Sequence, residues 1–211
     1  MKIGFLGDSI TYGYDLDNRE RDRYATLVCD ALGCEQVNLG ITGTLVARAG
    51  LSRSDGTSFL DRLPMLEGCD RAVVFGGTND YFWSDGPLNG DGPDCFVPAV
   101  DLLCRELLRL FSSDRILLVT PYPHHGTGNF QGGASWRDAS EHDTDAPNYL
   151  GSGLADYASA ICRVGGQHGL KVLDLFMAQP GFDWRAQTLD GCHPNEDGHR
   201  WLARQVLSEL E

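Results

Sequence analysis

Short segments rich in β-branched and aliphatic residues alternate along this 211-residue chain with longer segments that have helical spacing. Each short segment ends in Gly, Pro or polar residues, which is typical of buried strands bounded by loops. Such an alternation favours a mostly parallel sheet with helices on both faces, because a crossover between parallel strands usually passes through a helix. The predicted strands are the segments 2–7, 35–40, 71–77, 115–121 and 170–176.

The longer segments predict amphipathic helices. In one of them, Leu103, Leu107 and Leu110 recur at the three- and four-residue spacing of a helix face. Asp94 lies just before that segment and is a candidate N-cap. The predicted helices are 24–33, 96–111, 153–169 and 195–211.

The composition limits the partners of the chain. With 30 acidic and 17 basic residues, the formal net charge is −13, which disfavours binding that depends on neutralising phosphates. We therefore expect neither nucleic acid nor an anionic membrane surface as a partner. No segment is long and apolar enough to predict a membrane span, and the apolar start of the chain is shorter than a secretory leader. A single cytoplasmic domain over 1–211 is the expectation.

The histidines near residues 124–150 and the cysteines are potential metal ligands of the chain. Residues 124–150 are rich in Gly, Ser, Asp and Thr without a clear period, which predicts a polar loop insertion. His124 and His125 there could ligate a metal with His142 or Asp143, but their spacing is not that of a zinc motif, so we favour a solvated loop. The 7 cysteines form no Cys-x-x-Cys pair, and we expect reduced thiols.

A serine, a histidine and an aspartate are candidates for chemistry. Ser9 follows the first predicted strand, where a serine is most often a cap or turn residue. Near the other end of the chain, however, Asp190 precedes His193 by three residues, a spacing at which side chains in a turn can face one another. A carboxylate that orients an imidazole makes it a base for a serine hydroxyl, which is a weak nucleophile without one.

Acyl transfer also needs hydrogen-bond donors for the oxyanion that develops on the substrate. The loop after the second predicted strand offers the backbone N–H of Gly43, with Gly40 as an alternative in the same loop. The loop after the third strand offers the side-chain amide of Asn79, and Ser9 offers its own N–H. The carboxyl ends of parallel strands form one edge of a sheet, where we expect these groups to meet.

Four blocks of the chain together resemble the SGNH hydrolases, also called the GDSL esterase and lipase family. The blocks are GDSI at 7–10, with Ile10 in place of the usual leucine, NLGITG at 38–43, GTND at 77–80, and the pair Asp190 and His193. They occur in the family's order. The resemblance implies a three-layer α/β/α sandwich of flavodoxin-like type with a mostly parallel, about five-stranded sheet.

The resemblance also implies a mechanism. It is a two-step hydrolysis through an acyl-enzyme that requires no metal or organic cofactor. The resemblance implies Ser9 as the nucleophile and His193 as the general base, with Asp190 as the carboxylate that orients the imidazole. The implied oxyanion donors are the backbone N–H groups of Ser9 and Gly43 and the side-chain amide of Asn79.

Four neighbours of these residues have weaker assignments. We assign Asp8 and Asp80 to loop support, because short carboxylates commonly accept hydrogen bonds from backbone N–H groups in turns. Tyr81 and Trp83 follow Asn79 and are candidates for a substrate-binding platform, since aromatic faces supply large contact areas. The alternative is that these aromatic residues close the core beneath a loop.

The motifs specify acyl transfer and not the leaving group. Because 124–150 contains no long apolar run, we favour short-chain esters, first among them O-acetyl groups of a carbohydrate or small metabolite. A lysophospholipase or thioesterase is the second choice, and a non-catalytic carbohydrate-binding protein on this scaffold is the rival outside the enzymes. The expected partner is thus a small-molecule ester, and no oligomeric state is assigned. A dinucleotide or P-loop site is disfavoured because the glycine motifs of both are missing.

Overall fold

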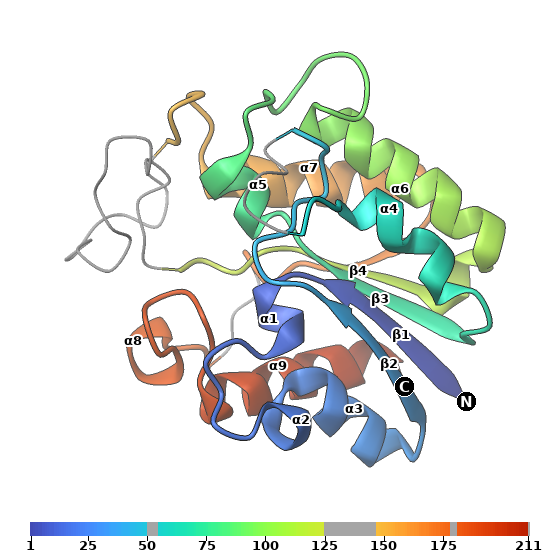
Figure 1. Cartoon of the computed structure of the whole chain (residues 1–211), viewed down its shortest axis with the longest axis vertical. Helices are drawn as coiled ribbons and strands as arrows, with labels where there is room; N and C mark the ends of the chain where they lie inside the picture. Colours follow the sequence, from blue (N-terminus) through green and yellow to red (C-terminus); the bar gives the residue numbers. More distant parts are fainter. Residues whose placement is uncertain (50–54, 125–146, 178–180, 211) are drawn as a thin grey trace.

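A five-stranded parallel sheet with the strand order β2-β1-β3-β4-β5 forms the centre of the computed structural model (Figure 1). The structure describes residues 1–49, 55–124, 147–177 and 181–210. The five strands are β1 (Lys2–Gly7), β2 (Glu35–Gly40), β3 (Arg71–Phe75), β4 (Ile116–Val119) and β5 (Lys171–Leu173).

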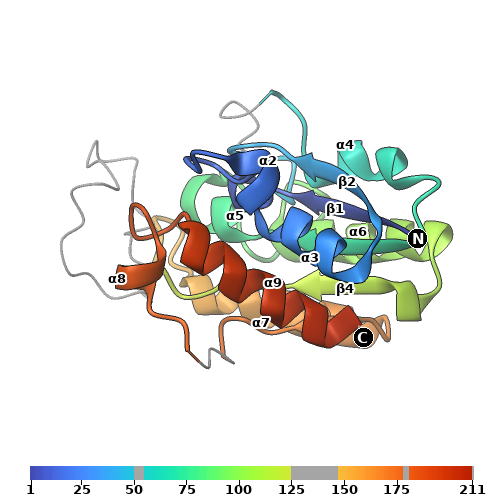
Figure 2. The ribbon, with the colours of Figure 1, turned by 90° about the horizontal axis from the view of Figure 1, so that it is seen from below.

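Helices cover both faces of this sheet, so the expected three-layer α/β/α sandwich is confirmed. Figures 1 and 2 show α3 and α9 side by side on one face, and α4, α6 and α7 on the other. Two short 3₁₀ helices, η2 (Leu63–Leu66) and η3 (Ser113–Arg115), precede β3 and β4. The α-helices are α1 (Ser9–Tyr12), α2 (Arg19–Asp22), α3 (Tyr24–Leu32), α4 (Phe59–Arg62), α5 (Thr78–Trp83), α6 (Phe96–Leu110), α7 (Leu154–Gln167), α8 (Trp184–Gln187) and α9 (Glu196–Leu210).

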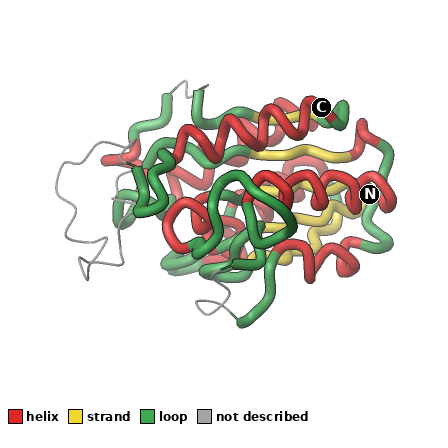
Figure 3. The backbone as a smooth tube through the Cα atoms, turned by 90° about the horizontal axis from the view of Figure 1, so that it is seen from above, coloured by secondary structure: helices red, strands yellow, loops and turns green. Residues whose placement is uncertain are grey.

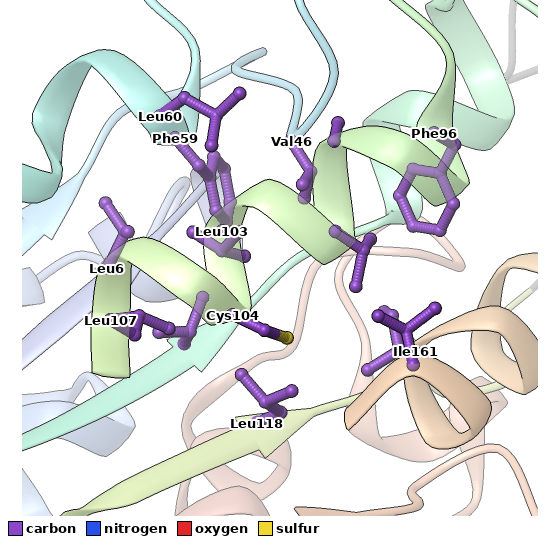
Figure 4. Close-up of a cluster of buried hydrophobic side chains, with 14 of the residues drawn as sticks. Leu6, Val46, Phe59, Leu60, Phe96, Leu103, Cys104, Leu107, Leu118 and Ile161 are labelled. Atoms are coloured by element: carbon purple, nitrogen blue, oxygen red, sulfur yellow. The ribbon is translucent and has the colours of Figure 1, made fainter. Parts of the chain in front are cut away.

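The core follows from the two-residue period of the strands. Phe5 of β1 belongs to the buried cluster beneath α3 and α9, whereas its neighbour Leu6 belongs to the cluster beneath α6 and α7. Figure 4 shows the second cluster, with Leu107 of α6 and Ile161 of α7 above Leu118 of β4. Because both faces are covered, the three inner strands β1, β3 and β4 are apolar on both sides, as their composition predicts.

The predicted strands and longer helices are all present, with shorter ends in some cases. The bounds of β1 and β2 agree with prediction, but β5 ends at Leu173 instead of continuing to Phe176. The reason is Asp174, whose carboxylate accepts the N–H groups of Phe176 at 3.1 Å and Met177 at 3.2 Å and so forms a turn.

The prediction that Asp94 caps α6 is wrong. The N-cap is Cys95, and no side chain caps this helix. Backbone groups replace the cap, because the N–H of Phe96 donates to the carbonyl of Pro87 at 3.2 Å and that of Val97 to Leu88 at 2.9 Å. The loop before the helix therefore satisfies donors that a capping carboxylate would otherwise accept from.

The predicted insertion at 124–150 lies largely outside the described residues, as do His125, His142 and Asp143. His124 is described, and the prediction that it lies in a solvated loop is wrong. The residue is 1% exposed, and its ring centroid lies 4.8 Å from that of Phe82. Packing against the aromatic rings of Tyr81, Phe82 and Tyr122 accounts for that burial. In the described ranges, no group of three potential metal ligands comes together, and no helix has the length and apolarity of a membrane span.

The close packing of α7 on the sheet predicts opposite effects at two adjacent glycines. A Cβ added at Gly165 would lie 2.7 Å from Val172 and 2.9 Å from Leu118, whereas one at Gly166 would meet nothing within 4 Å. We expect Gly166→Ala to stabilise the protein by roughly 0.5 kcal/mol, since alanine favours helix. Gly165→Ala should destabilise it by about 1 kcal/mol or more through overpacking. Denaturant unfolding measures both, and equal stabilities would contradict the packing described here.

The contact between α3 and α9 includes a histidine buried in neutral form. His199 is 0% exposed, and its Nδ1 accepts the N–H of Tyr24 at 3.1 Å. Burial lowers the pKa of His199 from 6.5 to about 3. The unfolded chain therefore binds a proton at this residue below about pH 6.5 that the folded protein does not bind until about pH 3.

The stability that neutral His199 contributes should thus be present above pH 6.5 and be lost as the pH falls towards 3, by up to about 1.4 kcal/mol per pH unit. Buried Asp8 and Asp80 act in the opposite direction, because burial raises their pKa values to about 6 and about 7. His199→Asn keeps an acceptor for Tyr24 and isolates the histidine contribution. Denaturant unfolding should show the stability difference between wild type and variant shrinking from pH 7 to pH 4; a constant difference would contradict this expectation.

Candidate active site

The turn between β1 and α1 presents Ser9 at the carboxyl edge of the sheet. Asp8 is the N-cap of α1, and its Oδ1 accepts the N–H of Ile10 at 2.9 Å. Asp8 is 1% exposed and Ser9 is 6% exposed, so the carboxylate lies beneath the turn. Burial raises the pKa of Asp8 to about 6, and the hydrogen bond from Ile10 opposes that shift. These contacts agree with the expected supporting role of Asp8.

A second turn, directly before α9, holds Asp190 and His193. An antiparallel bridge between Thr188 and Pro194 closes it. Oδ1 of Asp190 accepts the backbone N–H groups of Cys192 at 2.9 Å and His193 at 2.7 Å, and Oδ2 lies 2.6 Å from Nδ1 of His193. The same carboxylate therefore fixes both the backbone of the turn and the orientation of the imidazole.

The two turns meet, although they are 184 positions apart in the sequence. Nε2 of His193 lies 3.0 Å from Oγ of Ser9. Figure 3 shows loops gathered at one end of the strands, which is the end where these turns lie. If Nδ1–H donates to Asp190, then Nε2 carries a lone pair and can accept the Ser9 hydroxyl proton.

Opposing effects act on the Asp190 carboxyl. Burial alone would raise its pKa, but the hydrogen bond and charge attraction of His193, with the two backbone donors, outweigh burial and lower the pKa below its ordinary value. Asp190 is thus held ionised beside the imidazole. An ionised carboxylate at this position stabilises a protonated His193, which is the state that follows proton transfer from a hydroxyl.

Tyr14 is a neighbour of the site that sequence analysis did not identify. Its ring centroid lies 4.7 Å from that of His193, with 47° between the ring planes. An aromatic ring at this distance packs against the imidazole and limits its movement. The chain reverses at Gly13 after the short helix α1, and no periodic pattern in the sequence indicates this contact.

Asn79 and Asp80 lie in the first turn of α5 and hold the loop that follows β2. Nδ2 of Asn79 donates to the carbonyl of Thr44 at 3.0 Å. The Asp80 carboxylate accepts the N–H groups of Val46 at 3.0 Å and Ala47 at 2.8 Å. Asp80 is completely buried, which raises its pKa to about 7. Asp80 thus has a supporting role, but it supports the 44–47 loop more directly than the loop of Asn79.

The hydrogen bonds of Gly40 and Gly43 indicate which of the two backbone N–H groups is the better candidate for an oxyanion donor. The N–H of Gly40 donates to Oδ1 of Asn38 at 2.9 Å and is not available to a substrate. The N–H of Gly43 has no acceptor among the residues that the structure describes. Gly43 has a φ of 77°, which is in the left-handed region that favours glycine. These contacts favour Gly43 over Gly40 as an oxyanion donor.

The candidate platform after Asn79 needs a correction. Tyr81 is 0% exposed, and its ring packs against Tyr157 of α7 with the centroids 6.0 Å apart. The expectation that Tyr81 contacts substrate is therefore wrong, because α5 turns this side chain into the core. Tyr81 instead fits the alternative that these aromatic residues close the core beneath a loop. Trp83 is half-buried and packs against the same core, and a substrate contact by Trp83 stays a prediction.

A comparison with protein-family profiles identifies the family of the chain. The profile of the GDSL-like Lipase/Acylhydrolase family matches residues 5–201, which includes both turns and the loops between them. The chain belongs to this family. No functionally curated protein matches the chain in sequence. Membership of this family supports esterase activity.

Solved structures similar to this GDSL-like protein cover nearly all of it. A protein from Lactobacillus plantarum is 27% identical, with a TM-score of 0.79 over 99% of this chain and 95% of its own. A lipase/acylhydrolase from Enterococcus faecalis is 23% identical, with a TM-score of 0.66 over 99% and 94%. An acetyl xylan esterase, AlAXEase, is 20% identical, with a TM-score of 0.68 over 100% of both chains. The last two show that the fold is shared.

The dual contact of Asp190 predicts a selective loss of activity in Asp190→Asn. The amide oxygen can keep the backbone hydrogen bonds, while the amide NH₂ would donate to Nδ1 of His193. That moves the ring proton to Nε2, which then cannot accept from Ser9, so kcat for p-nitrophenyl acetate should fall roughly 10,000-fold. Circular dichroism should be unchanged.

Asp197→Asn on α9 is the matched control, because this carboxylate is 70% exposed and forms a surface ion pair with Arg200. It should retain wild-type turnover. Asp190→Asn with more than a tenth of wild-type activity would rule out the proposed orientation of the imidazole.

Proposed function

We propose that this protein is a serine ester hydrolase that removes short acyl groups through an acyl-enzyme. One observation carries the proposal: Nε2 of His193 lies 3.0 Å from Oγ of Ser9 while Nδ1 lies 2.6 Å from Asp190. This chain of contacts activates a hydroxyl nucleophile, and a protein that only binds a ligand has no need of it.

In the first step, His193 takes the proton of the Ser9 hydroxyl as Oγ forms a bond to the ester carbonyl carbon. The carbonyl electron pair moves to oxygen, and the N–H groups of Ser9 and Gly43 with the Asn79 amide stabilise that charge. Collapse of the tetrahedral intermediate breaks the bond to the alcohol oxygen. His193 returns the proton to this oxygen, and the alcohol leaves an acyl group on Ser9.

In the second step, water replaces the alcohol. His193 takes a proton from the water as its oxygen attacks the acyl carbon, and the same donors stabilise the second oxyanion. The intermediate collapses, Oγ of Ser9 recovers its proton from His193, and the carboxylic acid is released. Asp190 keeps its charge throughout and stabilises the imidazolium in both steps.

Short acyl groups are our first choice of substrate, and O-acetyl groups of a carbohydrate or small metabolite are the proposed class. The polar composition of residues 124–150 supports this choice, as does the shared fold with a protein described as an acetyl xylan esterase. One observation favours a longer chain: Leu189, adjacent to Asp190, is 49% exposed and offers apolar surface next to the proposed catalytic residues. A lysophospholipase or thioesterase is therefore the second candidate.

The proposal predicts a single reactive serine. A fluorophosphonate probe should label the wild-type protein once, and Ser9→Ala should abolish both labelling and turnover of p-nitrophenyl acetate. Ser208→Ala is the matched control, because this exposed serine on α9 donates its hydroxyl to the carbonyl of Gln205, one turn back on the same helix. It should retain both signals.

A series of p-nitrophenyl esters then separates the two substrate classes. Maximal kcat/KM at acetate or butyrate supports the first choice, and a maximum at long chains supports the second. A folded wild-type protein that is neither labelled nor active would instead support the rival, a carbohydrate-binding protein on a hydrolase scaffold.

A further inference from the structure

Arg62, at the end of α4, is a buried cation outside the residues that the proposed mechanism uses. It is 3% exposed, and burial lowers its pKa to about 10 although Asp55, Asp8 and Asp61 act against this shift at longer range. Within the described ranges, no carboxylate forms an ion pair with its guanidinium. A buried charge without a paired carboxylate is costly unless polar groups satisfy it, so its partners indicate its purpose.

Those partners lie at the carboxyl ends of the two strands that lead into the site. Nη1 of Arg62 donates to the carbonyl of Gly7 at 3.1 Å and to the carbonyl of Leu39. Nη2 donates to the hydroxyl of Thr44 at 2.7 Å. The guanidinium therefore links the end of β1, which precedes Ser9, and the end of β2 to the loop that contains Thr44.

Thr44 is held from two sides. Its hydroxyl accepts from Arg62 and donates to the carbonyl of Ile41 at 2.8 Å. Its own carbonyl accepts from the side-chain amide of Asn79 at 3.0 Å. Gly43, the proposed oxyanion donor, is the residue directly before Thr44. The position of the Gly43 N–H relative to Ser9 therefore depends on the contact between Arg62 and Thr44.

We propose that Arg62 is a positioning residue for the oxyanion loop, 41–47, and that it acts on the transition state through Thr44. The inference rests on the proposed function. Arginine suits this position because its planar fork reaches acceptors in several directions at once, whereas the single ammonium group of lysine cannot reproduce that geometry. The ring of Phe59 below the guanidinium, 5.1 Å away, further fixes its plane.

Thr44→Val is the decisive variant, because it keeps the side-chain shape and the Arg62 charge but removes the hydroxyl that joins them. We expect kcat for p-nitrophenyl acetate to fall roughly 10- to 100-fold, since a displacement of about 1 Å in a positioned group has effects of this size. KM should stay within about twofold, because the contact acts on the oxyanion and not on the bound ester. The affinity for a boronic acid, which forms a tetrahedral adduct, should fall in parallel with kcat.

Two controls separate positioning from a loss of stability. Thr44→Ser restores the hydroxyl and should restore kcat. Gly165→Ala weakens the packing of α7, far along the chain from this loop, and should leave kcat unchanged when assayed well below its melting temperature. Arg62→Lys should lower kcat, and the double variant with Thr44→Val should lose little more than either single variant, because both changes remove the same contact.

The outcomes distinguish this inference from the function on which it rests. An active wild type with an unaffected Thr44→Val, or a loss confined to KM, overturns the positioning role of Arg62 and leaves the esterase proposal intact. A wild type without fluorophosphonate labelling or turnover overturns both. Loss of kcat in Thr44→Val with recovery in Thr44→Ser is the expected result.

Discussion

The contact between His193 and Ser9 depends on how accurately the first and last helices of the chain are held together. Tyr24 provides that connection from the first turn of α3. Its backbone N–H donates to Nδ1 of His199 on α9, and its hydroxyl lies 2.9 Å from that of Thr11 on α1. One buried residue thus bridges the helix that begins with Ser9 and the helix that follows His193. The neutral, buried state of His199 is a condition of this bridge, since a protonated Nδ1 could not accept.

The ionisable side chains beneath the site share one feature, which is that their hydrogen bonds are mainly to backbone groups. Asp8, Asp80 and Arg62 are all buried, and each is satisfied mainly by backbone groups of the loops that meet at the carboxyl edge of the sheet. Charged partners make such hydrogen bonds shorter and stronger than neutral ones. The proposed catalytic groups are therefore supported by a layer of hydrogen bonds between buried ionisable side chains and backbone groups. Preorganised donors of this kind avoid reorganisation as charge develops on an oxyanion.

The sequence predicts those parts of the molecule that depend on local pattern. The apolar period and strong loop signals predict β1, β2 and the sandwich, and the Asp190–His193 spacing predicts a turn in which one side chain faces the other. The N-cap prediction for Asp94 fails because backbone carbonyls, and not a side chain, accept the first N–H groups of α6. The prediction that Tyr81 contacts substrate fails because adjacent aromatic residues on a short helix show no period from which the buried face can be inferred.

Arg62 illustrates why the remaining contacts are beyond sequence analysis. An arginine at the end of a four-residue helix has the same local pattern whether it points to solvent or under a sheet. What decides its direction is the set of acceptors at Gly7, Leu39 and Thr44, which come from three separate segments and meet only in the folded protein. Because parallel strands leave polar groups at their carboxyl ends, a cation that reaches several of them gains more than one at the surface would. The same topology that creates the site thus also creates the need for its support.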